Sequence, residues 1–147
     1  MRISTRFIMA IHVLIATKLF HDQMKVTSEL LGGSTGANPV IIRNLTSQLQ
    51  KAGLISVARG TGGAEITKPL SEISFYDVYT AVEDKSENNP FHFHKNPNPE
   101  CPVGRNIHDL LDGPLEEIQE SMKSVLKQFT LDDIYECLIE KLNKEDH

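Results

Sequence analysis

The stretch Ala37-Asn38-Pro39-Val40-Ile41-Ile42-Arg43-Asn44-Leu45-Thr46-Ser47-Gln48-Leu49-Gln50-Lys51-Ala52-Gly53 decides the fold of this chain. Asn38 is a favourable N-cap, Pro39 suits the first position of a helix, and Gly53 suits the residue after its end. The apolar residues recur at helical spacing and predict one buried face, formed by Ile41, Leu45, Leu49 and Ala52. The sequence therefore predicts a capped helix whose remaining surface is polar.

Two further helices are predicted before this one. Ser4–Phe20 is apolar on nearly all sides, as expected of a helix at the centre of a core. Thr27–Leu31, or a slightly longer segment, predicts a short helix whose end is weakened by Gly32 and Gly33.

Two β-prone runs follow the capped helix. Leu54–Val57 and Ala64–Ile66 are joined by Arg59-Gly60-Thr61-Gly62-Gly63, which predicts a hairpin with a glycine-rich tip. Helix, short helix, tight turn, capped helix and hairpin is the element order of a winged helix-turn-helix. In that fold the capped helix enters the major groove of DNA.

The second half of the chain is organised by two capping boxes and one long apolar stripe. Ser74 and Thr130 each begin a capping box that starts a helix. Residues 84–102, rich in Asn, Pro and charge, predict a linker or an ordered loop. An apolar stripe with alternating steps of three and four then predicts a long helix with a coiled-coil-like seam: Ile107, Leu111, Leu115, Ile118, Met122, Val125 and Phe129. Pro114 lies inside this helix and is expected to kink it.

The predicted fold is mainly α with a small β-hairpin wing, that is, a winged helix-turn-helix plus a long C-terminal dimerisation helix. We expect three parts. Residues 1–83 form the winged helix-turn-helix domain, residues 84–102 a linker or effector loop, and residues 103–147 the dimerisation helix and a C-terminal helix.

Charge is divided unevenly along the chain. Residues 1–70 carry eight Lys or Arg and three Asp or Glu, a net charge of +5, whereas the remainder carries −10. A basic N-terminal half joined to an acidic C-terminal half suggests a module that binds a polyanion, attached to a part that stays away from it.

The capped helix and the hairpin tip carry residue types that bind DNA. Arg pairs with guanine, Asn or Gln pairs with adenine, and an apolar side chain contacts the thymine methyl group. We therefore expect base contacts from Val40, Arg43, Asn44 and Gln48, and phosphate contacts from Ser47 and Lys51. Arg59 suits the narrow minor groove of A·T-rich DNA. The other expected contacts are Arg2, Ser4, Ser28, Ala37, Asn38, Pro39 and Thr61.

Seven motifs spread over nearly the whole chain match one known family. They are Met1–Phe7, Thr27–Leu31, Asn38–Arg43, Leu49–Ile55, Arg59–Ala64, Asp77-Val78 and Cys101–Gly104. Together they resemble the Rrf-two family of bacterial transcription regulators. The resemblance implies a homodimer in which the long helix crosses its symmetry mate and pairs two winged helices on a palindromic operator in double-stranded DNA. It also favours a repressor over an activator.

The same resemblance raises the question of an iron–sulfur cluster. Members of the family that bind a cluster carry three cysteines in the region around Cys101, because thiolates hold the irons. This chain has one cysteine there, and its other cysteine, Cys137, lies in the last predicted helix. We therefore expect no cluster and no other cofactor.

Three interpretations of Cys101 stay open. It is a thiol sensor that forms a sulfenic acid, or a disulfide with Cys137 or with the equivalent cysteine of a partner chain. Alternatively, it is a metal ligand with His92, His94 and perhaps His108, although this spacing is not a recognised zinc pattern. The favoured interpretation is packing as a small buried residue, or an unidentified ligand. Cys137 is expected to be a core residue.

No catalytic constellation appears in the sequence, so we expect no enzyme. Arg2 and Arg6 before Phe7–Ala16 resemble the start of a signal peptide, but His12 and Lys18 interrupt the apolar run, which is too short to span a bilayer. With two cysteines, the chain is expected in the cytoplasm, away from membranes. The alternative function is a winged-helix interaction or sensor module that no longer binds DNA, which the acidic total charge would suit.

Overall fold

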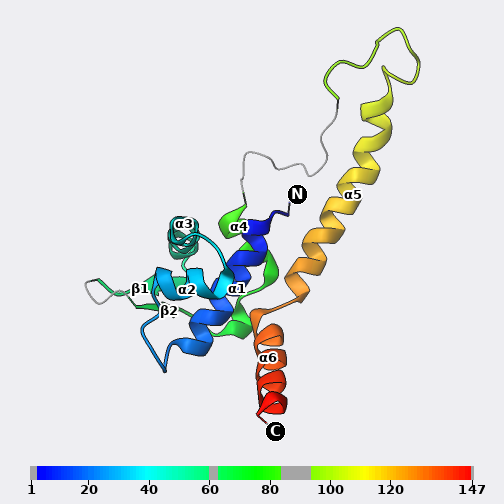
Figure 1. Ribbon diagram of the computed structural model, residues 1–147. Helices are drawn as coiled ribbons and strands as arrows, with labels where there is room; N and C mark the ends of the chain where they lie inside the picture. The colour runs from blue at the N-terminus through cyan, green and yellow to red at the C-terminus, as the bar shows by residue number, and fades with distance from the viewer. Residues whose placement is uncertain (1–2, 60–62, 84–93, 147) are drawn as a thin grey trace.

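The computed structural model of the protein describes residues 3–59, 63–83 and 94–146. Within them the element order is α1 (Thr5–Phe20), α2 (Ser28–Thr35), α3 (Pro39–Lys51), β1 (Ile55–Val57), β2 (Ala64–Ile66), the 3-10 turn η1 (Leu70–Glu72), α4 (Phe75–Val82), α5 (Ile107–Gln128) and α6 (Leu131–Glu145). The helices α1–α4 and the hairpin form one body, and α5 projects away from it (Figure 1). The predicted class, mainly helical with a hairpin wing, is confirmed.

Helix α1 runs through the centre of this body, as its composition predicts. Ser4 caps it by accepting a hydrogen bond from the backbone N–H of Arg6 at 3.2 Å. Its one buried polar side chain, Thr17, donates its hydroxyl to the carbonyl of Val13 at 2.7 Å, so burial leaves that hydroxyl paired. Ile8 departs from the expectation of a helix buried on all sides, because 60% of its surface is exposed.

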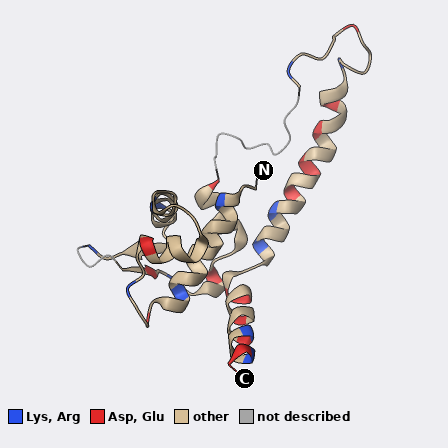
Figure 2. Cartoon of the chain, in the orientation of Figure 1, with Lys and Arg blue, Asp and Glu red and all other residues tan. Residues whose placement is uncertain are grey.

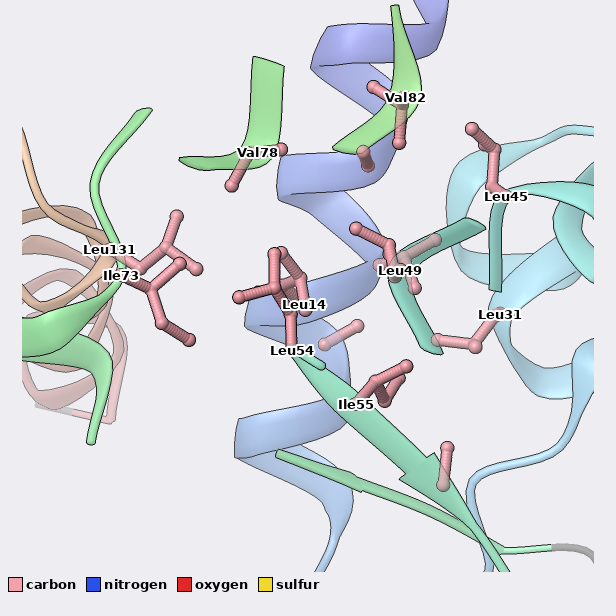
Figure 3. Packing of buried hydrophobic residues seen from close by; sticks show 14 of the residues in the cluster. Leu14, Leu31, Leu45, Leu49, Leu54, Ile55, Ile73, Val78, Val82 and Leu131 are labelled. Atoms are coloured by element: carbon pink, nitrogen blue, oxygen red, sulfur yellow. The ribbon is translucent and has the colours of Figure 1, made fainter. Parts of the chain in front are cut away.

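The core forms around Leu14 of α1. Figure 3 shows side chains of α3, β1 and α4 arranged about it, with Leu131 of α6 on the same cluster. Leu14 and Leu131 are both 0% exposed. Because Leu131 is the first residue of α6, that helix is anchored on the winged-helix body rather than on α5 alone.

Helix α2 takes the longer form that the prediction allowed: it extends to Thr35, and Gly36, with a φ of +73°, is its C-cap. Gly32 is buried inside the helix, and a Cβ atom there would lie 3.1 Å from the carbonyl oxygen of Ala37. The helix therefore continues through Gly32 and Gly33, which were expected to weaken its end. Glycine at position 32 lets the turn into α3 approach α2 closely, and this packing outweighs a propensity cost of about 1 kcal/mol.

The buried face of α3 also differs from the prediction, which holds for two of its four residues. Ile42, Leu45 and Leu49 are each 0% exposed. Ile41 is 40% exposed, and Ala52 is exposed as well, so their assignment to the core was wrong. The helical spacing fits Ile41 and Ile42 almost equally well, and only the direction from which α1 packs on α3 distinguishes them.

The hairpin and both capping boxes form as predicted. Strand β1 pairs antiparallel with β2 in the register Ile55↔Ile66, Ser56↔Glu65 and Val57↔Ala64. Ser74 with Asp77 and Thr130 with Asp133 make reciprocal capping bonds.

A pair of backbone hydrogen bonds fixes the α5–α6 junction to the winged-helix body. The N–H of Phe75 donates to the carbonyl of Phe129, and the N–H of Leu131 donates to the carbonyl of Ile73, both at 2.9 Å. Helix α5 runs unbroken across Pro114, and the kink there stays a prediction. None of the helices in the described ranges combines the length and apolarity that a bilayer crossing requires.

Candidate nucleic-acid interface

The outer face of α3 carries five of the fourteen expected DNA contacts. Arg43, Asn44, Ser47 and Lys51 are exposed, and Val40 is 55% exposed. Positions 40, 43, 44, 47 and 51 follow helical spacing, so these side chains share one face, opposite the buried Ile42, Leu45 and Leu49. This face combines hydrogen-bond donors, acceptors, two cations and one apolar group.

The residues before α3 build its start. The side-chain oxygen of Asn38 accepts a hydrogen bond from the backbone N–H of Val40 at 2.8 Å, and Pro39 occupies the first helical turn. Ala37 is half-buried against the core. These three predicted contact residues therefore set the direction of α3, and the N-terminal turn that they form carries the positive end of the helix dipole.

The wing carries one expected cation, Arg59, and lies beside Lys25, a cation that the sequence did not single out. Arg59 is exposed, whereas Thr61 lies outside the described residues, as does Arg2. The exposed Lys25 lies beside the hairpin: a Cβ atom on Gly63 would be 3.6 Å from its Cγ atom, and the N–H of Ala64 donates to the carbonyl of Val26 at 3.1 Å. An isolated lysine in a loop shows no spacing pattern, so only the folded chain reveals its place.

Ser4 and Ser28 occupy helix starts. The hydroxyl and the backbone N–H of Ser4 donate to a carboxylate oxygen of Glu83 at 2.8 and 3.1 Å. This hydroxyl is therefore already engaged within the chain. Ser28 is the half-buried first residue of α2.

Gln48 differs from the other expected base contacts because it is half-buried at the edge of the α3 face. Its side-chain oxygen accepts a hydrogen bond from the guanidinium of Arg6 on α1.

Most acidic side chains lie away from α3 and the wing; Glu65 on β2 and Glu29 on α2 are exceptions. Figure 2 shows Asp and Glu along the projecting α5 and along α6. The charge division of the sequence is thus also a division in space, which keeps most of the negative charge off the basic surface.

The segment before α5 folds into a compact turn around Cys101. The N–H of Cys101 donates to the carbonyl of Asn98 at 3.2 Å, and the N–H of Arg105 donates to the carbonyl of Cys101 at 3.0 Å. A Cβ atom on Gly104 would lie 2.5 Å from the Asn98 carbonyl oxygen, so this close approach requires glycine. Cys101 is exposed, and the expectation that it is buried was wrong. Backbone N–H groups of Gly104 and Val103 lower the pKa of its thiol, because they stabilise the thiolate.

Cys137 is likewise exposed, which corrects its assignment to the core. Helix α5, with 22 residues, separates the two cysteines and is about 33 Å long at 1.5 Å per residue. Figure 1 shows the Cys101 turn and α6 at opposite ends of α5. A disulfide requires Cα atoms about 4–7 Å apart, so the two cysteines of one protomer do not pair.

The expected metal ligands do not assemble into a ligand set in the described ranges. His92 lies outside these ranges. The rings of His94 and His108 approach each other edge to face, with 6.0 Å between their centroids. Across residues 3–59, 63–83 and 94–146, no group of three or more His, Cys, Asp or Glu side chains is arranged to hold an ion.

The fold and the exposed α3 face define the class of the protein, a winged helix-turn-helix of the DNA-binding kind. The model of the Rrf2 family, described as an iron-dependent transcriptional regulator, matches residues 3–137. The chain belongs to the Rrf2 family, the same Rrf-two family that its motifs resemble. It is therefore a DNA-binding transcriptional regulator and not an enzyme.

Individual relatives agree with this assignment. YwnA of Bacillus subtilis (strain 168), named among the HTH-type transcriptional regulators, is 37% identical over 132 residues, which are 90% of this chain and 96% of YwnA. A crystal structure of a protein described as DNA-binding shares 33% identity with a TM-score of 0.70, covering 88% of this chain and 97% of that one. IscR of T. potens, at 19% identity and a TM-score of 0.68, covers 94% of this chain and 88% of its own and shares the fold.

The donor set of this chain does not fit an iron–sulfur cluster. Clusters are held by several cysteine thiolates, with histidine replacing some of them in one class. The whole sequence contains two cysteines, and α5 separates them. This protomer therefore has no set of cysteine ligands that would account for the iron dependence named in the family description.

Cys101 is expected to react faster than Cys137 with iodoacetamide at neutral pH. Its lowered pKa increases the thiolate fraction, and the thiolate is the nucleophile. The rate of alkylation should therefore reach half its maximum at a pH below that of an ordinary cysteine. Intact-mass measurements on Cys101→Ser and Cys137→Ser over a pH series test this expectation. Faster labelling of the Cys101→Ser variant would contradict it.

Proposed function

We propose that this protein is a homodimeric, sequence-specific repressor that acts on a palindromic operator in the cytoplasm. The observation that carries the proposal is the exposed α3 face, where Arg43 and Asn44 stand beside Lys51 and opposite a fully buried apolar face. Arg and Asn side chains at these positions match the base edges of the major groove, and lysine matches phosphate. Arg59 on the wing adds a minor-groove contact.

The homodimer is supported by the apolar stripe of α5. This helix of 22 residues has no buried residue in the protomer. Ile118 and Val125 are 47% and 48% exposed, although both belong to the predicted seam. Phe129 at its end is also 48% exposed, with its ring 5.6 Å from that of Phe75. An amphipathic helix of this length requires a partner surface, and a second α5 has the matching stripe.

Ile118→Asp is expected to convert the dimer into monomers. The buried carboxylate would cost about 3–5 kcal/mol per protomer, which weakens dimerisation by at least about 100-fold. Sedimentation equilibrium measures the change. Ser124→Asp is the matched control, because it adds the same charge to an exposed position of α5 away from the stripe. Equal dissociation of both variants, or of neither, would contradict an interface along this stripe.

The proposed operator binding is tested by selecting duplexes from a random pool with the intact protein. The expected product is an inverted repeat whose half-site centres lie about one helical turn apart, or a multiple of it, because two α3 helices enter successive major grooves. Enrichment of a single non-repeated site would contradict the dimeric arrangement. Failure to enrich any sequence would instead favour a winged-helix interaction module.

We also propose that the turn around Cys101 receives the signal. Its thiol is exposed, and the lowered pKa makes it nucleophilic. Reaction with a peroxide would transfer one oxygen to sulfur, giving a sulfenic acid and releasing water. The DNA affinity of the protein before and after mild peroxide, compared with that of Cys101→Ser, tests this role. Equal responses of the two proteins would contradict it.

A further inference from the structure

The contact between Arg6 and Gln48 fixes which atom of the Gln48 side-chain amide, the oxygen or the nitrogen, faces Arg6. Arg6 lies in the first turn of α1, and its guanidinium donates to the side-chain oxygen of Gln48 on α3. A guanidinium carries only donors, so the amide must turn its oxygen and not its nitrogen toward Arg6. The amide nitrogen, with its two N–H donors, is left for any further partner.

Arg6 is itself held in place by a chain of hydrogen bonds. Its backbone N–H donates to the hydroxyl of Ser4 at 3.2 Å. Both the hydroxyl and the backbone N–H of Ser4 donate to Glu83, which follows α4. Three segments distant in sequence therefore meet here: the start of α1, the end of α4 and the second half of α3. Arg6 and Gln48 are both half-buried, which limits the freedom of each side chain.

We propose that Arg6 is a positioning residue for base recognition, which holds Gln48 so that it offers only donors to DNA. This proposal rests on the proposed operator binding. A free glutamine pairs with adenine by donating to N7 and accepting from N6, and that pairing uses its oxygen. Because its oxygen is turned toward Arg6, the side of Gln48 that faces away from Arg6 carries the two N–H donors, and these match guanine, whose N7 and O6 atoms are adjacent acceptors. The adenine contact expected from the sequence is thus replaced by a guanine contact.

The test compares base preferences of the intact dimer for operator duplexes that carry each base in turn at every position. The wild-type protein should prefer guanine over adenine by about tenfold at one position of each half-site. Gln48→Ala should abolish that preference at the same position. Arg6→Met, which keeps an unbranched apolar side chain but removes the donors, should shift the preference to adenine there and leave the other positions unchanged. Arg6→Lys keeps a cationic group that carries only donors and should retain guanine.

Matched controls separate positioning from simple loss of charge. Lys18→Met removes a cation from the exposed last turn of α1 and should leave every base preference unchanged. If Arg6 merely contacted a phosphate, Arg6→Met would weaken binding to all sequences alike without moving the preference. That result, or an unchanged preference in Gln48→Ala, would overturn the proposal while operator binding by the wild type stands. Absence of sequence preference in the wild type would overturn the proposed function as well. Thermal unfolding confirms that each variant is folded.

Discussion

Replacing Ile42 by alanine is expected to lower the free energy of unfolding by about 2–5 kcal/mol. Ile42 is 0% exposed in the core between α3 and α1, so the substitution removes buried methyl and methylene groups and leaves a cavity. Urea unfolding at a fixed protein concentration measures the change, because the stability of a dimer depends on that concentration.

The neighbouring residue provides the control. Ile41→Ala makes the same chemical change at a side chain that is 40% exposed, and we expect it to cost less than half as much. The pair therefore tests how α3 is rotated on the core. Equal losses would show that both isoleucines are buried to the same extent, and a larger loss for Ile41→Ala would restore the face that spacing alone predicts.

Arg43→Ala is expected to weaken operator binding by about 1–3 kcal/mol for each half-site, with relaxed preference at the base that Arg43 contacts. The guanidinium of Arg43 is exposed on the outer face of α3, and a guanidinium fork is able to pair bidentately with guanine. Fluorescence anisotropy with the selected operator, and with versions substituted at single positions, measures both effects.

Lys51→Ala on the same face separates base contacts from phosphate contacts. We expect it to weaken binding to all duplexes to a similar degree. The slope of the logarithm of affinity against the logarithm of salt concentration should become shallower by the amount that corresponds to about one phosphate contact in each half-site. If Arg43→Ala weakened all sequences equally while Lys51→Ala changed base preference, the two assigned roles would be reversed.

The sequence predicted where helices begin more accurately than which side of a helix is buried. Asn38 and Pro39 at the start of α3, and the capping boxes at Ser74 and Thr130, form as predicted because their bonds join residues close in sequence. The buried face of α3 was wrong at Ile41 and Ala52, and it missed Ile42, because helical spacing does not show which side of the helix the other elements cover.

The glycines and cysteines show a second limit of sequence reasoning. Gly32 was interpreted as weakening the end of a helix, but it also allows the close approach to Ala37, a contact made only after α2 and α3 dock. Cysteine is a residue type usually found in protein cores, but Cys101 and Cys137 are both exposed. The reason is that neither the turn before α5 nor the outer side of α6 packs on the winged-helix body.

Only the part of the candidate interface that lies on a single helix could be predicted from the sequence. The α3 face follows from spacing within one segment. Lys25 beside the wing and Arg6 against Gln48 depend on contacts between segments far apart in sequence, such as the 42 positions between Arg6 and Gln48. No motif within one segment indicates such contacts.

The affinity for the selected palindromic duplex, measured between about 50 and 200 mM salt, tests the central claim most directly. The account predicts that the logarithm of the affinity falls linearly with the logarithm of the salt concentration, with a slope near −0.9 for each neutralised phosphate. A scrambled duplex of the same composition should bind at least about 1,000-fold more weakly. Affinity that is indifferent to salt, absent at low salt or equal for the two duplexes would contradict a regulator that recognises its operator through α3 and the wing.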